Sequence, residues 1–548
     1  MAAPRAATPV VRARASSAAK AAPASLSRAP SSGPLVNSIK TAARYPRTFS
    51  SGLGNSIKET LTPKFGGFSR ALRTASTLTD QRLARLPPGV QADLAGVLLH
   101  GAVDEQGAAG QQFLRVLIAR GRTPGRVMAA LSRLSYFDEY GPSEHLSGPA
   151  SKEFSSLMAQ LRAQPGDWAA FHKFAEDATA APERAGTIEL LIDGHRYFPA
   201  IEKSIDAATR YVLAVQYELH SDDAGWQVAE RLGAAAQRGV YTINVNDQVG
   251  SVTTDRSLFR YLDEQGVHHI DRASQRVMAG QLEHRKMIVV DGREGFIGGM
   301  NVGTAYRDRW HDVQSRVTGP VVADMTDSLV REDKALGLNI PRGLRAELRK
   351  QRAAARSAAG PSAGSTGIRL VLHDGLADQN QKLLYLRAID TCSKRVLIEN
   401  PYLSDSDIVA HLAAAARRGV RVVVIVPHVN DQTFGSAAAR SHYQELIESG
   451  AEVYEYIGPN REQPQMSHGK VALFDDEVAT IGSSNLDARS LVHNHEANIW
   501  VRDAQLVHQM ASQVFDVDIE RSERIREYQP TMLMRLEDGI ARKLAPHL

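Results

Sequence analysis

Two segments of the chain share one arrangement of apolar and polar positions. In each segment a His-x-Lys triplet precedes four bulky apolar residues and an Asp, and a second apolar run ends at an Asn. The segments are HRKMIVVDGREGFIGGMN at 284–301 and HGKVALFDDEVATIGSSN at 468–485. A short run of β-branched or large apolar residues between turn-forming residues predicts a buried β-strand. We therefore expect two strands in each segment, the second of which leads to the Asn.

The similarity between the two halves of the chain extends beyond these segments. Their histidines are 184 positions apart, and the pairs Val212–Leu213 and Val396–Leu397 keep the same separation. The stretches AAAQRGV and AAARRGV deviate from this spacing by four residues, which one length change explains. Each half is expected to open with a helix, followed by a strand, an amphipathic helix ending at Arg-Gly-Val and a further β-rich run. An internal repeat of alternating helices and strands predicts two α/β units on sheets covered by helices.

Composition divides the chain around this repeat. Residues 1–87 are rich in Ala, Ser, Arg and Pro and poor in large apolar residues, and we interpret them as a disordered basic tail. Residues 88–185 have apolar residues at three- and four-residue spacing, which predicts a helical region. The first α/β domain is expected at 186–350 and the second at 368–548. The Ala-, Gly- and Ser-rich stretch 351–367 between them is expected to be a flexible linker.

Charge is distributed unevenly along the chain. The formal net charge is +4, but residues 1–58 hold nine Lys and Arg residues and no acidic residue, so the rest of the chain has a net charge of −5. A protein that grips the nucleic-acid backbone usually needs a basic groove over many phosphates, so charge disfavours a nucleic-acid partner. The basic tail allows three interpretations: an organellar targeting segment, a contact for anionic lipid, or a low-complexity tail without a specific role.

Neither a membrane-spanning helix nor a secretory signal is expected. No stretch reaches about 18 consecutive apolar residues, and the start of the chain has no apolar signal core. The single cysteine, Cys392, excludes an intrachain disulfide and a cysteine-based metal cluster. It precedes a strand-like run, and we interpret it as a small buried residue.

The polar residues of the repeated segments suit a phosphate group. On a strand, residues i and i+2 point to the same side, so the His and Lys of each segment project together. The small residues before each Asn let a ligand approach closely. Each half can therefore present an imidazole, an ammonium group and a carboxamide to one spot: His284, Lys286 and Asn301 in the first half, and His468, Lys470 and Asn485 in the second. The cation repels a metal ion and no acidic or thiolate ligand completes a metal shell, so neither a metal nor a cofactor is expected.

Two such half-sites can divide the chemistry of phosphodiester cleavage between them. One neutral imidazole can attack phosphorus while a second, protonated imidazole donates a proton to the leaving oxygen. The lysines and asparagines would stabilise charge on the nonbridging oxygens. Because two like residues must hold unlike protonation states, their pKa values belong to the pair. The duplication is therefore expected to form one active site, for which a monomer is sufficient; the oligomeric state is left open.

Four acidic residues are further candidates. Asp312 and Glu496 each lie 28 positions after the His of their half. A carboxylate bonded to an imidazole fixes its tautomer, although the sequence leaves open which carboxylate serves which His. Asp291 and Asp475 complete the repeated pattern and are candidates for the catalytic set. Their odd offset from His along a strand equally permits a turn or capping role.

Both segments resemble the HxKxxxxD…GxxN signature of the phospholipase D superfamily, over roughly residues 186–548. Within the superfamily, WHDVQSRVTGPVV (310–322), ENPY, GSSNLDARS and NHEAN are most similar to bacterial-type cardiolipin synthases. The resemblance implies two tandem phospholipase D-like α/β/α sandwich domains that share one site about a pseudo-two-fold axis. It also implies a phosphohistidine mechanism without a metal, in which His284 is the nucleophile and His468 the general acid.

The resemblance implies a phosphatidyltransferase that converts phosphatidylglycerol to cardiolipin and glycerol. Its partners would be anionic phospholipid and a membrane surface to which it attaches peripherally, that of the bacterial cytoplasmic membrane. Hydrolysis of phospholipids to phosphatidic acid by the same site is the alternative, and a phosphodiesterase acting on nucleic acid is a third. Binding without catalysis would require the loss of a motif residue, and both sets are complete. Organellar targeting and secretion as an effector stay open.

The chain departs from the family pattern near the motifs. Many cardiolipin synthases have two N-terminal membrane helices, which are not expected here. Ala305 stands where an acidic residue often precedes the tyrosine, and His311 replaces a usual arginine. Gly299 stands where the second half has Ser483. These differences leave the expected chemistry intact and bear on the acceptor alcohol.

Overall fold

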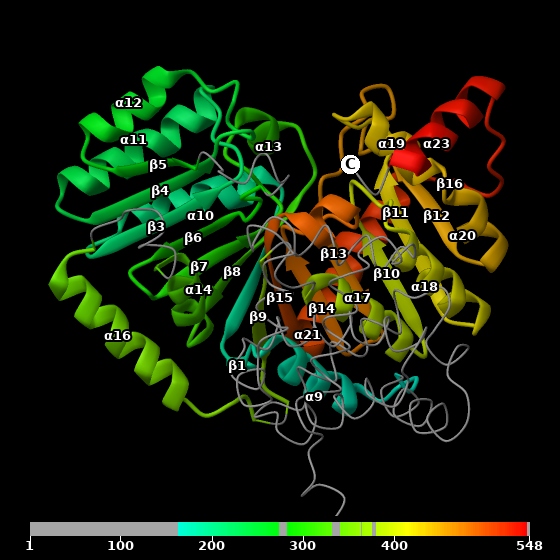
Figure 1. Ribbon diagram of the computed structural model, residues 1–548, viewed down its shortest axis with the longest axis horizontal. Helices are drawn as coiled ribbons and strands as arrows, with labels where there is room; N and C mark the ends of the chain where they lie inside the picture. The colour runs from blue at the N-terminus through cyan, green and yellow to red at the C-terminus, as the bar shows by residue number, and fades with distance from the viewer. Residues whose placement is uncertain (1–162, 273–281, 331–339, 363, 375–379, 545–548) are drawn as a thin grey trace, which may run out of the picture.

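Two β-sheets lie side by side and carry helices on their outer faces (Figure 1). The computed structural model describes residues 163–272, 282–330, 340–362, 364–374 and 380–544. The expected disordered tail and most of the expected helical region lie outside these residues.

The first half of the repeat forms one sheet. Its strands are β2 (Thr187–Ile192), β3 (Tyr211–Gln216), β4 (Tyr241–Asp247), β5 (His268–Arg272), β6 (Met287–Val290), β7 (Glu294–Gly298) and β8 (Val313–Thr318). Its helices are α10 (Gly194–Asp206), α11 (Asp223–Gln237), α12 (Arg256–Glu264), α13 (Thr304–Asp308), α14 (Val321–Val330) and α16 (Arg342–Ser357). The strand order is β2-β8-β7-β6-β3-β4-β5, in which β3, β4 and β5 are parallel and the other neighbours antiparallel.

The second half repeats this arrangement and adds a strand at each edge. Its strands are β9 (Gly367–Asp374), β10 (Arg395–Glu399), β11 (Arg421–Pro427), β12 (Glu452–Tyr456), β13 (Val471–Phe474), β14 (Val478–Gly482), β15 (His495–Arg502) and β16 (Ser522–Ile525), with β1 (Arg184–Ala185) beside β9. Its helices are α17 (Asn380–Thr391), α18 (Ser406–Arg417), α19 (Thr433–Arg440), α20 (Tyr443–Ser449), α21 (Ala504–Met510), α22 (Asp516–Glu520) and α23 (Met532–Leu544), with the π-helical turns η3 (Arg489–His493) and η4 (Ala511–Phe515). The order is β1-β9-β15-β14-β13-β10-β11-β12-β16.

The strands expected in the repeated segments are confirmed. All residues of β6 and β13 are buried, and β7 and β14 pair with them as antiparallel hairpins. The expectation that each half opens with a helix is wrong, because β2 and β9 come first and pair with β8 and β15. Strand β2 lies at a sheet edge with a single fully buried residue, Leu191, so it lacks the apolar run that marks a buried strand.

The linker expected at 351–367 is shorter than predicted. Helix α16 continues to Ser357, because Gln, Arg and Ala favour helix, and it stops before Gly360 and Pro361. Before residue 186, β1 and helix α9 (Trp168–Thr179) both join the second half: β1 pairs with β9, and α9 packs on α17. The expected domain boundaries stay predictions.

Three large hydrophobic cores hold the layers together in the described part of the chain. One lies between the first sheet and helices α10 to α12, and another between the second sheet and helices α9, α17, α18 and α20. The third joins the halves, because Val289 and Ile297 share it with Leu473 and Ile481. Strands β7 and β8 lie against β14 and β15 in this central core. Apolar burial between the sheets therefore holds the halves in one relative orientation.

Two backbone bridges cross between the halves beside this core. At one bridge the amide of His284 donates to the carbonyl of His495 at 3.0 Å, and at the other the amide of His468 donates to the carbonyl of His311 at 2.7 Å. Residues 311 and 495 are as far apart as 284 and 468, so the repeat relates the bridges. Each motif histidine is therefore anchored to a segment of the other half.

The Asp at the end of each repeated strand caps the start of a neighbouring strand. Asp291 and Asp475 have φ of 52° and 51°, a left-handed conformation that Asp adopts more readily than most residues. Their carboxylates accept hydrogen bonds from consecutive backbone amides: those of Thr209, Arg210 and Tyr211 for Asp291, and those of Ser393, Lys394 and Arg395 for Asp475. These contacts are those of a turn and capping residue.

We expect Asp475→Asn to lower the free energy of unfolding by about 2 kcal/mol, because amides that now donate to a charged oxygen would meet a neutral one. Asn keeps the tolerance for positive φ, so the backbone turn should survive. Denaturant titration measures the change. Asp476→Asn, at the exposed neighbour, should change stability by less than about 1 kcal/mol. Equal effects of the two substitutions would contradict the capping role.

Candidate active site

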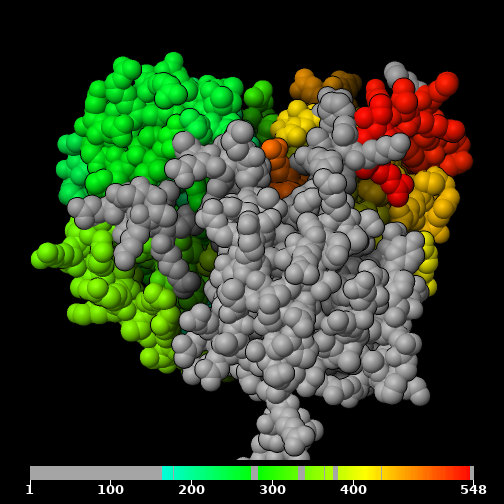
Figure 2. Space-filling model, in the orientation of Figure 1, coloured from blue at the N-terminus to red at the C-terminus, as the bar shows by residue number. Residues whose placement is uncertain are grey.

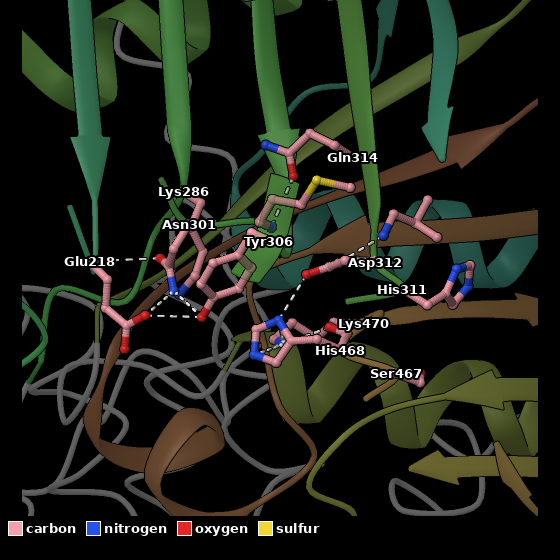
Figure 3. Close-up of polar contacts among 12 residues, drawn as sticks. Glu218, Lys286, Asn301, Tyr306, His311, Asp312, Gln314, Ser467, His468 and Lys470 are labelled. Carbon is pink, nitrogen blue, oxygen red and sulfur yellow. Dashed lines mark hydrogen bonds and ion pairs between the residues drawn. The ribbon is translucent and has the colours of Figure 1, made fainter. Parts of the chain in front are cut away.

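Each motif histidine is held by a carboxylate from the opposite half. His284 Nδ1 lies 2.8 Å from Glu496 Oε1, and His468 Nδ1 lies 2.8 Å from Asp312 Oδ2. Figure 3 shows the second pair. Both carboxylate residues directly follow the residue that accepts the crossing backbone bond, so the bridges bring acid and imidazole together. The pairing that the sequence left open is therefore a crossed one.

The four basic groups of the motifs are buried together. His284 is 7% exposed and His468 5%, while Lys286 and Lys470 are 0% exposed. Lys286 Nζ donates to the carbonyl of His284 at 2.7 Å, and Lys470 Nζ donates to that of His468 at 2.8 Å. In the second segment Lys470 Nζ also lies 3.0 Å from both ring nitrogens of His468, as expected for side chains that project together.

Burial and mutual repulsion shift these groups toward their neutral forms. Burial lowers the pKa of Lys286 to about 7 and that of Lys470 to about 8. Burial also lowers the pKa of His284, and the charges of both lysines add to this effect. The pKa of His468 falls well below its ordinary value through burial and the same two lysines. Because each lysine acts on the histidine of the other half, the groups form one electrostatic site.

The two carboxylates differ in protonation. Burial raises the pKa of Asp312 to about 7. Burial also acts to raise the pKa of Glu496, but contacts with His284 and a hydrogen bond from the Ser483 hydroxyl outweigh it and lower the pKa. The first half has Gly299 at the position of this serine, where a Cβ would lie 2.3 Å from Asp312 Oδ1. Asp is one methylene shorter than Glu, so its carboxylate lies against the backbone and leaves no room for a serine.

This asymmetry suits the two histidines to different tasks. His284 is a neutral imidazole whose Nδ1–H faces an ionised carboxylate, which leaves its Nε2 lone pair available for attack. His468 and Asp312 share one proton near neutral pH, since the pKa of the acid is raised and that of the imidazole lowered. Such an arrangement can attack phosphorus on one side and protonate a leaving oxygen on the other.

The two asparagines are not equivalent. Asn301 Nδ2 donates to the Tyr306 hydroxyl at 2.7 Å and to Glu218 Oε2 at 3.1 Å, so its amide group is committed to protein partners (Figure 3). Asn485 Oδ1, in contrast, is buried without a hydrogen-bond partner among the described residues. The two half-sites therefore also differ at Asn.

Aromatic rings lie against both histidines. The ring of Tyr217 lies 4.8 Å from that of His284, and the ring of Tyr306 lies 5.4 Å from that of His468, both edge-on. Tyr217 and its neighbour Glu218 were not among the residues predicted for the site. They are the first two residues after β3, and the carboxyl end of a parallel strand is where functional side chains gather in α/β sheets. That position is the signal that could have found them.

Asp291 and Asp475 do not join this group, which corrects their expected place among the catalytic residues. They follow the four-residue strands β6 and β13, which span about 13 Å and separate them from Lys286 and Lys470. Their carboxylates are occupied by backbone amides at that far end. We assign them no chemical step.

One group of residues with metal-ligand side chains lies at the seam between the halves. His311, Glu399 and Asp518 are buried there with their ligand atoms within 4.8 Å of one another. Both ring nitrogens of His311 already have carboxylate partners, Asp193 at 2.7 Å and Asp518 at 3.1 Å. Burial lowers the pKa of His311, but the carboxylates outweigh burial and raise it well above its ordinary value. A protonated imidazole cannot bind a metal, so the group is better described as an ion cluster that ties the halves together.

Known proteins are similar to this chain in both sequence and fold. Residues 385–518 match the family model described as "Cardiolipin synthase, PLD-like domain". Cardiolipin synthase A of Pseudomonas entomophila (strain L48) is 31% identical over 378 residues, 66% of this chain and 75% of that protein. Cardiolipin synthase B of Escherichia coli (strain K12) is 32% identical over 333 residues, 58% of this chain and 76% of that protein. The crystal structure of phosphatidylserine synthase of Haemophilus influenzae Rd KW20 has a TM-score of 0.53 at 17% identity, over 68% of this chain and 98% of that one, and confirms the predicted fold class.

We expect the affinity of the site for sulfate, a divalent anion, to fall as pH rises from about 6 to about 9. The pKa values of about 7 and about 8 for Lys286 and Lys470 mean that both ammonium groups lose their charge in this range. Losing a charge-assisted hydrogen bond should raise Kd about tenfold or more in calorimetry.

The variant Lys286→Met should bind sulfate weakly even at the acidic end of this range. Lys394→Met, at a lysine whose side chain is 63% exposed, is the matched control and should bind like the parent. An affinity that does not change with pH would contradict the charge assignment.

Proposed function

Because the chain belongs to the cardiolipin synthase family of phospholipase D-like proteins, we propose that it is a phosphatidyltransferase that converts phosphatidylglycerol to cardiolipin and glycerol. The observation that carries this proposal is the crossed pairing of two histidines with carboxylates around two buried lysines. Buried cations bind an anionic phosphodiester, and unlike His–carboxylate pairs supply a nucleophile and an acid.

The first step forms a phosphohistidine. Nε2 of His284 attacks the phosphorus of phosphatidylglycerol, and the bond from phosphorus to the glycerol oxygen breaks. Nε2–H of His468 gives its proton to that oxygen, the proton shared with Asp312 stays on Nδ1 of His468, and glycerol leaves. Lys286 and Lys470 stabilise the negative charge that grows on the nonbridging oxygens.

The second step transfers the phosphatidyl group to an alcohol. A hydroxyl of a second phosphatidylglycerol attacks the phosphohistidine, its proton returns to the pair of His468 and Asp312, and the nitrogen–phosphorus bond breaks to release cardiolipin. Water in place of the second lipid would give phosphatidic acid. The near-complete burial of the motif residues supports a lipid acceptor, because a closed site limits access of water.

We place this reaction at the surface of a membrane, that of the bacterial cytoplasmic membrane, because the substrates reside in the bilayer and the relatives are bacterial. Within the described part of the chain, no helix combines the length and apolar character needed to cross a bilayer. Helix α23 exposes an apolar stripe of three residues spaced one helical turn apart. They are Met532, Leu536 and Ile540, which are 91%, 62% and 46% exposed. Figure 2 shows this helix, in red, at the outer surface of the molecule. Interfacial helices insert such stripes into the headgroup region.

We expect the purified protein to convert labelled phosphatidylglycerol to cardiolipin, with equal rates in the presence and absence of EDTA. His284→Ala and His468→Ala should each lower the rate at least about a thousandfold, because each removes a group that takes part in bond making or proton transfer. Mass spectrometry of the products distinguishes cardiolipin from phosphatidic acid. His508→Ala, at an exposed histidine of α21, is the control and should react like the parent. Phosphatidic acid as the main product would overturn the synthase assignment in favour of hydrolysis.

We expect the triple variant Met532→Ser, Leu536→Ser, Ile540→Ser to float poorly with phosphatidylglycerol vesicles. Inserting an apolar side chain contributes about 1.5–3 kcal/mol, so the partition coefficient should fall at least about thirtyfold. Turnover of a soluble short-chain phosphatidylglycerol should be unchanged, because the stripe is not part of the catalytic group. If the triple variant floats as well as the parent protein, α23 does not form the membrane contact.

A further inference from the structure

Glu218 is a carboxylate beside the motif residues that the proposed reaction leaves without a task. It is the second residue after β3, and its side chain is 24% exposed. Three donors converge on its Oε2: the Tyr306 hydroxyl at 3.0 Å, Asn301 Nδ2 at 3.1 Å and His220 Nε2 at 3.1 Å. Figure 3 shows the other oxygen, Oε1, pointing away from Asn301 and Tyr306. Among the described residues, no hydrogen bond reaches Oε1.

This geometry makes Glu218 an acceptor with one oxygen available. Burial acts to raise its pKa, but the hydrogen bond and charge of His220 and the charge of Lys286 outweigh burial and lower the pKa. An ionised carboxylate has no proton to donate, so Oε1 can only accept a hydrogen bond. Phosphate oxygens would be repelled there, whereas a donor group of the substrate would be bound.

The surroundings favour a neutral donor over a cationic one. His220 and Lys286 act more strongly on Glu218 than the nearby carboxylate of Asp431 does, so positive charge prevails around it, and contact with Glu218 raises the pKa of His220. An additional ammonium group would meet these charges, but a hydroxyl group would not. Glu218 is thus suited to a hydroxyl.

The position of Glu218 relates it to the alcohol rather than to the diacyl part of the lipid. Tyr306 connects it to His468, since the Tyr306 hydroxyl donates to Glu218 and the Tyr306 ring lies 5.4 Å from the imidazole. His468 exchanges its proton with the leaving and attacking alcohol oxygens in the proposed reaction. The repeat places Tyr402 at the position equivalent to Glu218, so the second half has no matching carboxylate there. The Tyr402 hydroxyl instead donates to Asp431.

We propose that Glu218, held in place by Asn301 and Tyr306, forms a subsite for a free hydroxyl of a glycerol headgroup. This inference rests on the proposed function, in which the Glu218 subsite would select the alcohol of the headgroup. In a glycerol headgroup the ester oxygen and a free hydroxyl are separated by one or two carbon–carbon bonds, and the subsite would hold the free hydroxyl while the ester oxygen faces His468. The subsite favours polyhydroxylated alcohols over alcohols with a single hydroxyl.

The test compares Glu218→Gln with the parent on two lipids that differ in the headgroup alone. Phosphatidylglycerol has free headgroup hydroxyls and phosphatidylmethanol has none. We expect KM for phosphatidylglycerol to rise about tenfold to a hundredfold, because a hydrogen bond to a charged acceptor is lost. The effect on phosphatidylmethanol should be less than about threefold. Glu230→Gln, at an exposed glutamate of α11, is the matched control and should retain the parent's preference.

Four results would overturn the subsite. Equal losses on both lipids would indicate a purely structural Glu218, and no loss on either would exclude a role in binding. A parent preference for phosphatidylethanolamine that disappears in Glu218→Gln would identify an ammonium subsite instead. Tyr306→Phe, which keeps the ring and removes one donor to Glu218, should shift headgroup preference in the same direction as Glu218→Gln, and an opposite shift would also contradict the proposal.

A binding measurement separates this inference from the proposed function. Glycerophosphoglycerol, a soluble headgroup probe, should bind the parent more tightly than glycerophosphomethanol in calorimetry, and Glu218→Gln should remove the difference. If the parent protein binds with this preference but turns over no phospholipid, the proposed function is wrong and the subsite is supported. If the parent protein makes cardiolipin but binds both probes equally, the subsite is wrong and the proposed function is supported.

Discussion

The reciprocal exchange of backbone hydrogen bonds between the halves is the constraint on which the site depends. Each motif histidine donates its amide to the residue just before the carboxylate that holds its ring. A strand register is a discrete quantity, because a slip of one residue turns every side chain to the other face. Register at these bridges therefore decides whether an imidazole meets a carboxylate or a hydrophobic residue. The shared central core keeps the two sheets in the orientation that the bridges require.

Gene duplication of a half-site would by itself give two like groups, whereas phosphodiester cleavage needs an acid and a nucleophile. The chain separates them with small differences. Glu496 has a serine donor and stays ionised, while Asp312 lies against Gly299 and has its pKa raised to about 7. The two histidines therefore differ because one is paired with Glu and the other with the shorter Asp, and because only the Glu receives a serine hydrogen bond. Burial increases the effect of such differences in hydrogen bonding on the pKa values. The difference between the halves also includes Asn301, which donates to Glu218, the residue proposed to bind the alcohol.

Burying two lysines and two histidines is unfavourable unless opposite charges accompany them. The crossed carboxylates compensate part of this charge, and the lowered pKa values of the lysines reflect the remainder. An anionic phosphodiester that enters the site would restore full protonation of both lysines, so substrate binding and protonation are linked. The ion cluster of His311, Glu399 and Asp518 lies one residue from Asp312, and it fixes the segment that carries this acid. Charge interactions therefore hold the segment that carries Asp312 in place and also set the protonation of the catalytic groups.

The sequence by itself determined the elements whose signals are local: the buried strands β6 and β13, the repeat, and the set of His, Lys and Asn that suits phosphate. Periodicity and residue type carry this information, because they depend on neighbours a few positions away. Tertiary structure alone decided the crossing of Glu496 to His284 and of Asp312 to His468, the capping position of Asp291 and Asp475, and the convergence of Asn301 and Tyr306 on Glu218. Those contacts join residues up to 212 positions apart. They follow from how two sheets pack and which strand ends meet, and no local pattern encodes that.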